Sequence, residues 1–530
     1  MTGWLATILV FLPLAGALLV WLLPIGRFAG SLALLVALAE VGFWINALTR
    51  MDFNRAGPAP NFDQQTTWFS DLHVSYHVGF YAFSFWLAGL AVVVMAAAIA
   101  YAFWVGRERP RAYFGLMLFL TAAVVGVFAA QDLLLFYVFF EAMMIPLYVL
   151  IGVWGGPGRM GATVKFVIYT MAGSLLMLAA VIIFGLSRNS FDLVSTEPSN
   201  STWLFLGFAI AFAVKAPLFP LHGWLPDAYR ESSPEVAAVL SGVISKAAIF
   251  GFIRICFGKF PGPFDDFRVV ILALAVSGLV YGSLLAFRAP DVRGVIAYSS
   301  LAQMGLITIG VFAENTAGVS GAVLQSVNHG LISATLFLLA GAIERRTATG
   351  RLDRLGGMGR GRPALATVLM ATGIIALAVP GSSAFAGEFL ILAGIFGTGW
   401  GWAVAGATGI VLAAMYMLRL ISAVLHQQPG PAVSETALDL RPAELAILAS
   451  LVACLLALSV WPASISEHSL EKSSLRPALK ELVPAADYRQ LSDEQLAKLL
   501  SETVKEAQAL LPGTTFTFPP LPAKAPAFAP

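Results

Sequence analysis

The sequence is poor in charged residues, cysteine and histidine, and each shortage excludes a class of protein. Only 12% of the 530 residues are charged, against about 25% in ordinary soluble domains. Cys256 and Cys454 lie far apart inside apolar segments, and the six histidines show no metal-ligand spacing, so we expect no disulfide framework, metal site or redox centre in this chain. The net charge of +2 is scattered and forms no basic stripe, which argues against nucleic acid as a partner.

Apolar residues, in contrast, fill long stretches of the chain. Hydrophobic residues make up 58% of the sequence and the mean hydropathy is +0.81, more apolar surface than a water-soluble fold can bury. Runs of about 20 apolar residues, each long enough to cross a bilayer as a helix, predict an all-α membrane protein with about fourteen transmembrane helices. The predicted segments are residues 5–23, 29–48, 78–105, 113–130, 133–153, 164–186, 203–229, 235–257, 269–287, 292–312, 317–343, 364–397, 401–424 and 443–462.

Arginine and lysine are unevenly divided between alternate loops, and this predicts the orientation because cytoplasmic loops collect these residues. One set of loops holds most of them, from Arg27 through Arg107 and Arg230 to a dense group between Arg345 and Arg362. We therefore expect both termini outside, which requires an even number of crossings, in the inner membrane of a bacterial cell. The N-terminal stretch has no basic n-region, so we interpret it as the first membrane helix and not as a signal peptide.

Two of the predicted segments contain helix-breaking residues. Pro217, Pro220 and Pro226 interrupt the seventh segment, and the pair Pro380-Gly381 interrupts the twelfth. Broken helices at corresponding places of two halves are typical of inverted repeats with an ion site at the middle of the membrane. We predict two inverted five-helix repeats with broken helices 7 and 12.

These features divide the chain into four expected regions. Residues 1–77 hold the first two helices and an outside loop, 78–425 form the core of helices 3 to 13, and 426–464 hold the last helix. Residues 465–530 are more polar, and there we predict an extramembrane amphipathic helix at 492–511 followed by a Pro/Ala-rich tail.

Ionisable residues in the middle of apolar segments are the candidate functional groups. A charge at the bilayer centre costs at least about 2.5–3.5 kcal/mol, so such residues usually face a protein interior and have a function. Glu141, Lys215, Lys246 and Glu388 are well centred, and His329 titrates near neutral pH without help. A buried lysine keeps its proton beside a glutamate and can release it when the two separate, so we predict a proton path with a Glu141–Lys215 switch.

Structural explanations of the same residues stay open. Each buried charge could serve only to pair with a neighbour, and His329 could be a hydrogen-bonded core histidine. We expect structural or interface roles for Glu40 and Glu235. His222 and Asp227 either line a water path or satisfy backbone groups freed by the prolines.

Four separated motifs, in this order, resemble a known family. They are LLLFYVFFE at 133–141, KAPLFPLHGWLPD at 215–227, IAYSSLAQMG at 296–305 and PGSSAFAGEFLIL at 380–392. Over about residues 75–425 the sequence is similar to the antiporter-like membrane subunits of proton-pumping NADH:quinone oxidoreductase (respiratory complex I). Mrp-type cation/proton antiporters and membrane-bound hydrogenases share this family.

The resemblance implies a proton-translocating subunit of an oxidoreductase complex. Glu141 and Lys215 take the place of the family's paired switch, Lys246 that of its central relay lysine, and Glu388 that of its terminal proton-exit residue. Glutamate at the last position, where sister subunits usually carry lysine, favours the M type. The chain itself would bind no cofactor, because FMN, the iron–sulfur clusters, NADH and quinone belong to other subunits. Its partners would be other membrane-arm subunits, including sister antiporter-like subunits, and the lipid bilayer.

Rival functions share the same charged residues. The charged residues do not exclude a subunit of a multisubunit cation/proton antiporter driven by an ion gradient or a hydrogenase-linked pump, although Glu388 and its context favour complex I. A scaffold that conducts nothing is disfavoured, because it has no need for buried lysines beside broken helices. One departure concerns the path itself: Gln303 stands where many relatives have histidine, which keeps hydrogen bonding but loses titration.

Overall fold

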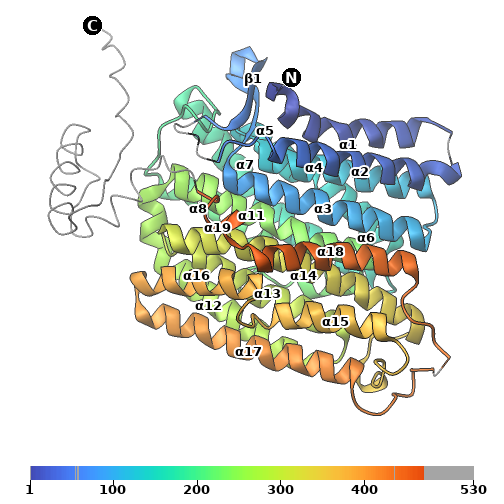
Figure 1. Cartoon of the computed structure of the whole chain (residues 1–530). Coiled ribbons are helices and arrows are strands. Elements are labelled where there is room, and N and C mark those ends of the chain that lie inside the picture. Colours follow the sequence, from blue (N-terminus) through green and yellow to red (C-terminus); the bar gives the residue numbers. More distant parts are fainter. Residues whose placement is uncertain (1, 25, 54, 56–58, 435, 471–530) are drawn as a thin grey trace, which may run out of the picture. The chain divides into compact units, whose positions relative to one another are not determined.

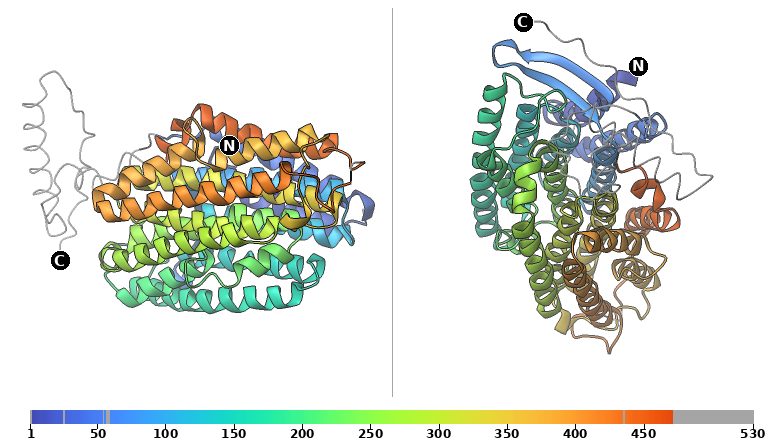
Figure 2. Two further views of the ribbon diagram at one scale, coloured as in Figure 1. Left: turned by 90° about the horizontal axis from the view of Figure 1, so that it is seen from below. Right: turned by 90° about the vertical axis from the view of Figure 1, so that its left-hand side faces the viewer.

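The computed structural model describes residues 2–24, 26–53, 55, 59–434 and 436–470, which belong to one compact unit, and shows long helices packed side by side (Figures 1 and 2). Twelve helical spans in the described ranges are long and apolar enough to cross a membrane, so the prediction of an all-α, multi-pass membrane protein is confirmed. They are α1 (Leu5–Leu22), α2 (Ala29–Leu48), α3 (Ala82–Val105), α4 (Pro110–Ala129), α5 with α6 (Leu133–Ala142, Met144–Trp154), α7 (Arg159–Arg188), α10 to η5 (Pro234–Phe257), α12 (Pro261–Arg288), α13 (Val292–Val311), α14 (Thr316–Thr347), α17 (Trp400–Leu425) and α18 (Pro442–Val460).

The two predicted broken segments account for the difference between fourteen and twelve. The seventh is divided into α8 (Thr202–Lys215) and α9 (Leu225–Glu231), and the twelfth into α15 (Pro363–Ala376) and α16 (Ser383–Thr398). All fourteen predicted segments therefore contain helix, although the inverted-repeat relation stays a prediction. The predicted amphipathic helix at 492–511 lies outside the described residues.

The backbone groups freed at both breaks have identifiable partners. In the first, the indole Nε1 of Trp224 donates to the Val214 carbonyl at 2.9 Å, close to the end of α8. In the second, Gly381 has a φ of 95°, which glycine adopts easily, and the Ser382 hydroxyl caps α16 by accepting from the Phe385 N–H. The breaks are thus ordered features of the membrane interior.

A β-hairpin was not predicted. Strand β1 (Asn61–Phe69) pairs antiparallel with β2 (Val74–Phe80), so the expected start of the third helix at residue 78 is wrong and α3 begins at Ala82. The physical reason is polarity: NFDQQTTWF is too polar for hydrocarbon, and pairing with it satisfies the backbone of the more apolar β2.

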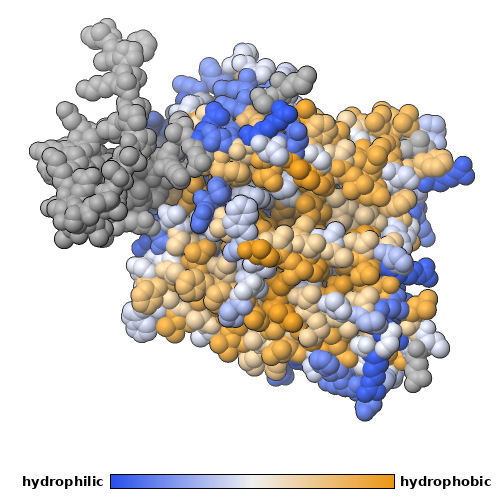
Figure 3. All heavy atoms as spheres, viewed as in Figure 1, coloured by the Kyte–Doolittle hydropathy of each residue, from blue (hydrophilic) through white to orange (hydrophobic). Residues whose placement is uncertain are grey.

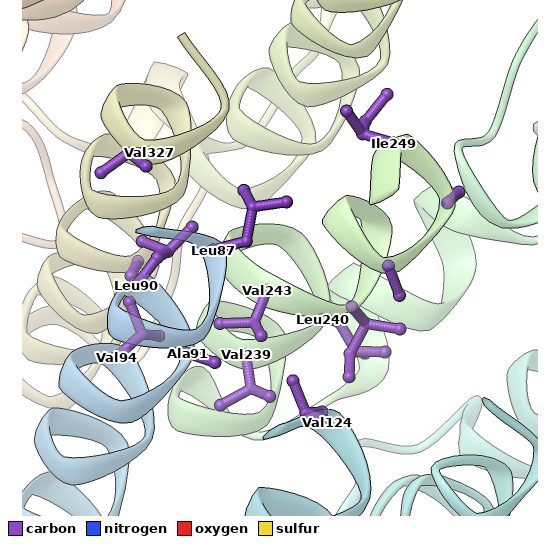
Figure 4. Close-up of a cluster of buried hydrophobic side chains, with 14 of the residues drawn as sticks. Leu87, Leu90, Ala91, Val94, Val124, Val239, Leu240, Val243, Ile249 and Val327 are labelled. Carbon is purple, nitrogen blue, oxygen red and sulfur yellow. The ribbon is translucent and has the colours of Figure 1, made fainter. Parts of the chain in front are cut away.

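Buried and lipid-facing helices differ clearly. Large apolar side chains such as Leu22, Trp203 and Val460 lie exposed on the outer helices, and Figure 3 shows a broad hydrophobic surface with hydrophilic residues gathered around β1 and the loops at the helix ends. In contrast, α14 and the α10–η5 span are entirely buried over their apolar windows. Apolar side chains of α3, α14 and this span, including Leu90, Val243 and Val327, pack together in the interior (Figure 4). The candidate residues lie in and beside this core.

Candidate functional site

Lys246 and His329 are brought together in the centre of the core. Lys246 belongs to α11 (Ser245–Gly251), which lies between two π-helical segments, η4 (Leu240–Ile244) and η5 (Phe252–Phe257). Such segments are rare and occur frequently at functional sites. The Lys246 Nζ lies 2.8 Å from His329 Nδ1 and donates to the Ser241 carbonyl at 2.7 Å.

A pair of glycines permits this contact. A Cβ atom at Gly242 would lie 2.9 Å from the Gly330 carbonyl oxygen, and one at Gly330 would lie 2.6 Å from that of Gly242. The backbones of η4 and α14 therefore approach closely, as small residues allow between membrane helices. Because His329 directly precedes Gly330, this approach places the imidazole against the lysine.

Glu388 is surrounded by side-chain amides. Its Oε1 accepts from Gln303 Nε2 at 3.1 Å and from Gln325 Nε2 at 3.3 Å, and Gln325 also donates to Gln303 Oε1 at 2.9 Å. Asn328 donates to the Ser383 carbonyl at 2.8 Å and so joins α14 to the start of α16. Among the described residues, no cation lies within 4.0 Å of Glu388, which is 2% exposed.

A small cavity is lined by the imidazole that contacts Lys246 and by the two glutamines that contact Glu388. Its volume is about 20 Å³, enough for one water molecule, and its polar lining includes Gln303, Gln325, His329 and Tyr416. The Nε2 of His329 and the Oε2 of Glu388 have no protein hydrogen-bond partner among the described residues. The imidazole that contacts Lys246 and the amides that contact Glu388 therefore open onto one space.

Glu141 and Lys215 are neighbours that do not touch. Lys215 is the last residue of α8, where the negative end of the helix dipole favours a cation. Its Nζ donates to the Phe140 carbonyl at 3.1 Å and lies 3.7 Å from the centre of the Phe140 ring. Within the described chain no carboxylate lies within 4.0 Å of this ammonium, and the Oε1 of Glu141 is buried without a partner. The paired switch stays a prediction.

Aromatic rings fill the space between Lys215 and Lys246. Phe140 packs against Phe136 and Phe212, with ring centres 5.5 and 5.9 Å away, and Phe136 stacks on Phe250, one turn after Lys246. No described hydrogen bond connects the two lysines. A proton therefore has no described hydrogen-bonded path between the two lysines.

Buried charges near the helix ends have a different environment. Glu235 pairs with Arg107 at 2.6 Å and accepts from the Tyr113 hydroxyl. Glu444 accepts from Arg345 and lies 2.7 Å from Arg346. Both carboxylates are fully enclosed and fully paired.

A histidine in the hairpin is held in the same way. His77 contacts Asp192, and its Nε2 lies 2.7 Å from the Oδ1 of Asp63. Burial opposes protonation of the imidazole, but the hydrogen bonds and charges of Asp192 and Asp63 outweigh it and raise the pKa of His77. Burial likewise works against the charge of Asp192, yet the hydrogen bonds from His77 and Ser195 lower its pKa to about 2. This triad fastens β2 to the chain after α7.

The other ionisable candidates belong neither to the Glu141–Lys215 pair nor to the group formed by Lys246, His329 and Glu388. Asp227 pairs with Lys165, whereas the His222 ring packs against Phe219 and Tyr281 and its Nδ1 has no described partner, so both interpretations of these residues stay open. Glu40 is 1% exposed in α2 with both carboxyl oxygens unpartnered among the described residues.

A second, larger cavity of about 470 Å³ opens among the loops at one end of the helices. Its charged lining includes Arg107, Arg230, Asp291, Arg293 and Glu344. Most of these arginines come from the arginine-rich set of loops.

The sequence analysis singled out Gln303 but missed the other amides, Gln325 and Asn328, and Phe140. Gln325, Asn328 and His329 follow one another at spacings that place them on one face of α14, and this pattern of polar residues in a buried helix was a usable signal. Phe140 gave no signal, because a phenylalanine in an apolar segment is expected to contact lipid or core.

Comparison with known proteins places this geometry in context. Residues 130–413 match the family described as NADH:quinone oxidoreductase/Mrp antiporter, TM. The NADH-quinone oxidoreductase subunit M of Rhodobacter capsulatus is 36% identical over 487 residues, which cover 87% of this chain and 94% of that protein. The subunit of the same name from Mycobacterium tuberculosis is 36% identical over 521 residues, covering 87% and 91%.

Solved structures show the same fold. A chain of respiratory complex I from Thermus thermophilus with bound NADH superposes with a TM-score of 0.79 at 30% identity, over 88% of this chain and 97% of that one. A chain of the Mrp complex from Dietzia sp. reaches a TM-score of 0.79 at 20% identity, over 91% and 98%, which is a likeness of fold alone.

Proposed function

This chain belongs to the NADH:quinone oxidoreductase/Mrp antiporter family, and from that premise we propose that it moves protons across the bilayer as the M-type membrane subunit of a NADH:quinone oxidoreductase. The observation that carries the proposal is the buried line formed by Lys246, His329, the small cavity and Glu388. Groups able to exchange protons follow one another along this buried line, and they lack the fixed ion pairs that surround other buried charges.

The steps follow from the contacts. The Lys246 ammonium donates a proton to His329 Nδ1, and the imidazole releases one from Nε2 to a water in the small cavity. The amides of Gln303 and Gln325 hold the Glu388 carboxylate beside that cavity, and Glu388 receives the proton and passes it on. Because an amide does not titrate, Gln303 orients the path while water carries the proton.

The driving force acts on the Glu141–Lys215 pair. Redox energy released in a separate peripheral arm reaches this subunit through neighbouring membrane subunits and shifts Lys215 relative to Glu141. Unit charges a few Å apart interact by several kcal/mol at an effective dielectric constant of about 20. The Lys215 charge acts on Lys246 through the low dielectric of the aromatic cluster, so a shift of that charge relative to Glu141 changes the proton affinity of Lys246.

The setting of the subunit follows from the same proposal. The arginine-rich loops and the larger cavity face the cytoplasm and supply protons, and both termini face outside in a bacterial inner membrane. FMN, the iron–sulfur clusters, NADH and quinone are bound by other subunits of the complex.

One purification tests this function. The tagged chain is isolated from native membranes in mild detergent, its companions are identified, and NADH:quinone reductase activity is measured. We expect companions with flavin and iron–sulfur centres and NADH-driven quinone reduction. Companions that are all membrane proteins, with cation/proton exchange and no NADH oxidation, would replace the proposal by the antiporter function.

A further inference from the structure

Two consecutive residues of α5 offer alternative sites for the same ammonium. Phe140 contacts Lys215 with both its carbonyl oxygen, at 3.1 Å, and its ring, at 3.7 Å from the centre. Glu141, the next residue, presents a carboxyl oxygen that is buried and unpartnered among the described residues. Lys215 occupies the first site, and among the described residues no cation lies within 4.0 Å of the Glu141 carboxylate.

We propose that Phe140 is a positioning residue of the Lys215 switch, whose carbonyl and ring hold the ammonium away from Glu141 and so define the second position of the lysine. This inference rests on the proposed function, in which Lys215 alternates between two positions. It assigns a residue to the position in which the Glu141–Lys215 pair is open.

The chemistry of the site explains why a ring is needed. An ammonium has three N–H donors, and Lys215, at 2% exposure, has one oxygen acceptor among the described residues. The face of an aromatic ring carries negative potential and attracts a cation by about 2 kcal/mol or more where water is excluded. A carbonyl alone would leave the cation poorly compensated, whereas the ring adds a second partner that has no proton to exchange.

The neighbours of Phe140 keep the ring in place. Phe136 and Phe212 pack against it with ring centres 5.5 and 5.9 Å away, and Phe140 is only 2% exposed. Phe212 is itself pressed against α11, where a Cβ atom at Gly251 would lie 2.4 Å from its ring. The site for the lysine is therefore part of a packed core and not a mobile surface contact.

Loss of the ring should favour the Glu141-bound position. An attraction of about 2 kcal/mol corresponds to a population ratio of about 30-fold, because each 1.4 kcal/mol is a factor of about ten. Lys215 then stays beside Glu141, and its movement from Glu141 to Phe140 becomes slow.

The test uses the intact complex in native membranes. Phe140→Leu removes the ring and keeps the carbonyl, and Phe136→Leu is the matched control, one helical turn away in the same cluster without contact to Lys215. Phe140→Tyr keeps an aromatic face, and Phe140→Met keeps the apolar volume should leucine prevent assembly. Proton pumping and NADH-driven quinone reduction are measured across pH, with Lys246→Met as a separate test of the proposed function.

We expect Phe140→Leu or Phe140→Met to lower coupled turnover about 10-fold and to change its pH profile, Phe140→Tyr to restore turnover to within about 3-fold of wild type, and Phe136→Leu to stay near wild type. Equal effects of the leucine variants at 140 and 136, with an unchanged pH profile, would overturn the positioning role. If Lys246→Met also pumps normally, the proposed function fails as well; if it does not, only the role of Phe140 is lost.

Discussion

Buried charges near the helix ends and buried charges at the centre of the membrane are held in opposite ways. Near the ends, Glu235 has Arg107 and Glu444 has two arginines. At the centre, Glu388 has only amides as described partners, and Lys246 has a histidine, a carbonyl and the Ser245 hydroxyl. Glutamate occurs in both regions, but only near the ends is it paired with a cation among the described residues.

This difference separates two uses of a charge. A buried carboxylate beside arginine is held in its charged form, because the nearby positive charge favours ionisation. Removing either partner leaves the other charge uncompensated in a low dielectric. A carboxylate held by neutral amides keeps access to both protonation states, since the amides can satisfy either one. The end pairs therefore fasten helices, and the central groups suit proton exchange.

The largest expected effect comes from exchanging one glutamate of each kind for glutamine. Glu388→Gln should leave the complex assembled but lower proton pumping by about 100-fold, the usual contribution of a group that transfers a proton. Glu444→Gln should instead cost about 3–5 kcal/mol of stability, because it leaves two arginines without their carboxylate. Assembled yield and pumping per assembled complex are measured for both variants.

The reverse pattern in these two variants would contradict the distinction between arginine-paired and amide-held glutamates. If Glu388→Gln reduced assembly and pumped normally per complex, Glu388 would belong with the structural charges. If Glu444→Gln assembled fully and failed to pump, pairing with arginine would not mark a structural role.

Gln303 allows a finer test of the central region. Gln303→Leu removes the amide that donates to Glu388 and accepts from Gln325, and we expect about 10-fold slower pumping, as the loss of about 1.4 kcal/mol of hydrogen bonding predicts. Gln303→His keeps hydrogen bonding and adds a titratable group, so its pumping should stay near wild type. Equal pumping by the leucine variant and wild type would remove Gln303 from the path.

The smallest effect is expected outside the membrane, at the His77 triad. Because the pKa of His77 is raised, its stabilisation is fully present below about pH 6.5 and is lost as pH rises through the raised value. The thermal unfolding midpoint of the wild type should fall between about pH 6 and about pH 9, and His77→Phe should remove that dependence with a loss of about 1.5–3 kcal/mol at the acidic end. Pumping should be unchanged; a variant with the wild-type pH dependence of stability would contradict this role.

How much of this the sequence predicts depends on the range of the interactions involved. Apolar runs predict the helices and prolines predict both breaks, because these are local properties of the chain. Centring in a helix singles out Lys246 and Glu388 for the same reason. The Lys246–His329 contact depends on the approach of Gly242 to Gly330, which only the packing of distant helices determines.

Two further features escaped prediction, one of the backbone and one of side-chain direction. The interruption between α5 and α6 at Met143 follows from Pro146, which lacks the N–H for the Ala142 carbonyl, yet apolarity concealed it within one segment. The Lys215 side chain points toward Phe140 and not toward Glu141, although these two residues are adjacent in α5. The sequence pattern does not tell which of two adjacent residues the lysine contacts.

The most direct test of the central claim is the number of protons pumped per NADH oxidised by the Lys246→Met complex in proteoliposomes. NADH oxidation by an artificial electron acceptor serves as the control for an intact peripheral arm. We expect an assembled complex with slowed quinone reduction and a reduced proton yield, because methionine fills the space but has no proton to give to His329. A normal proton yield at a normal rate would contradict the relay and leave the buried line a structural feature.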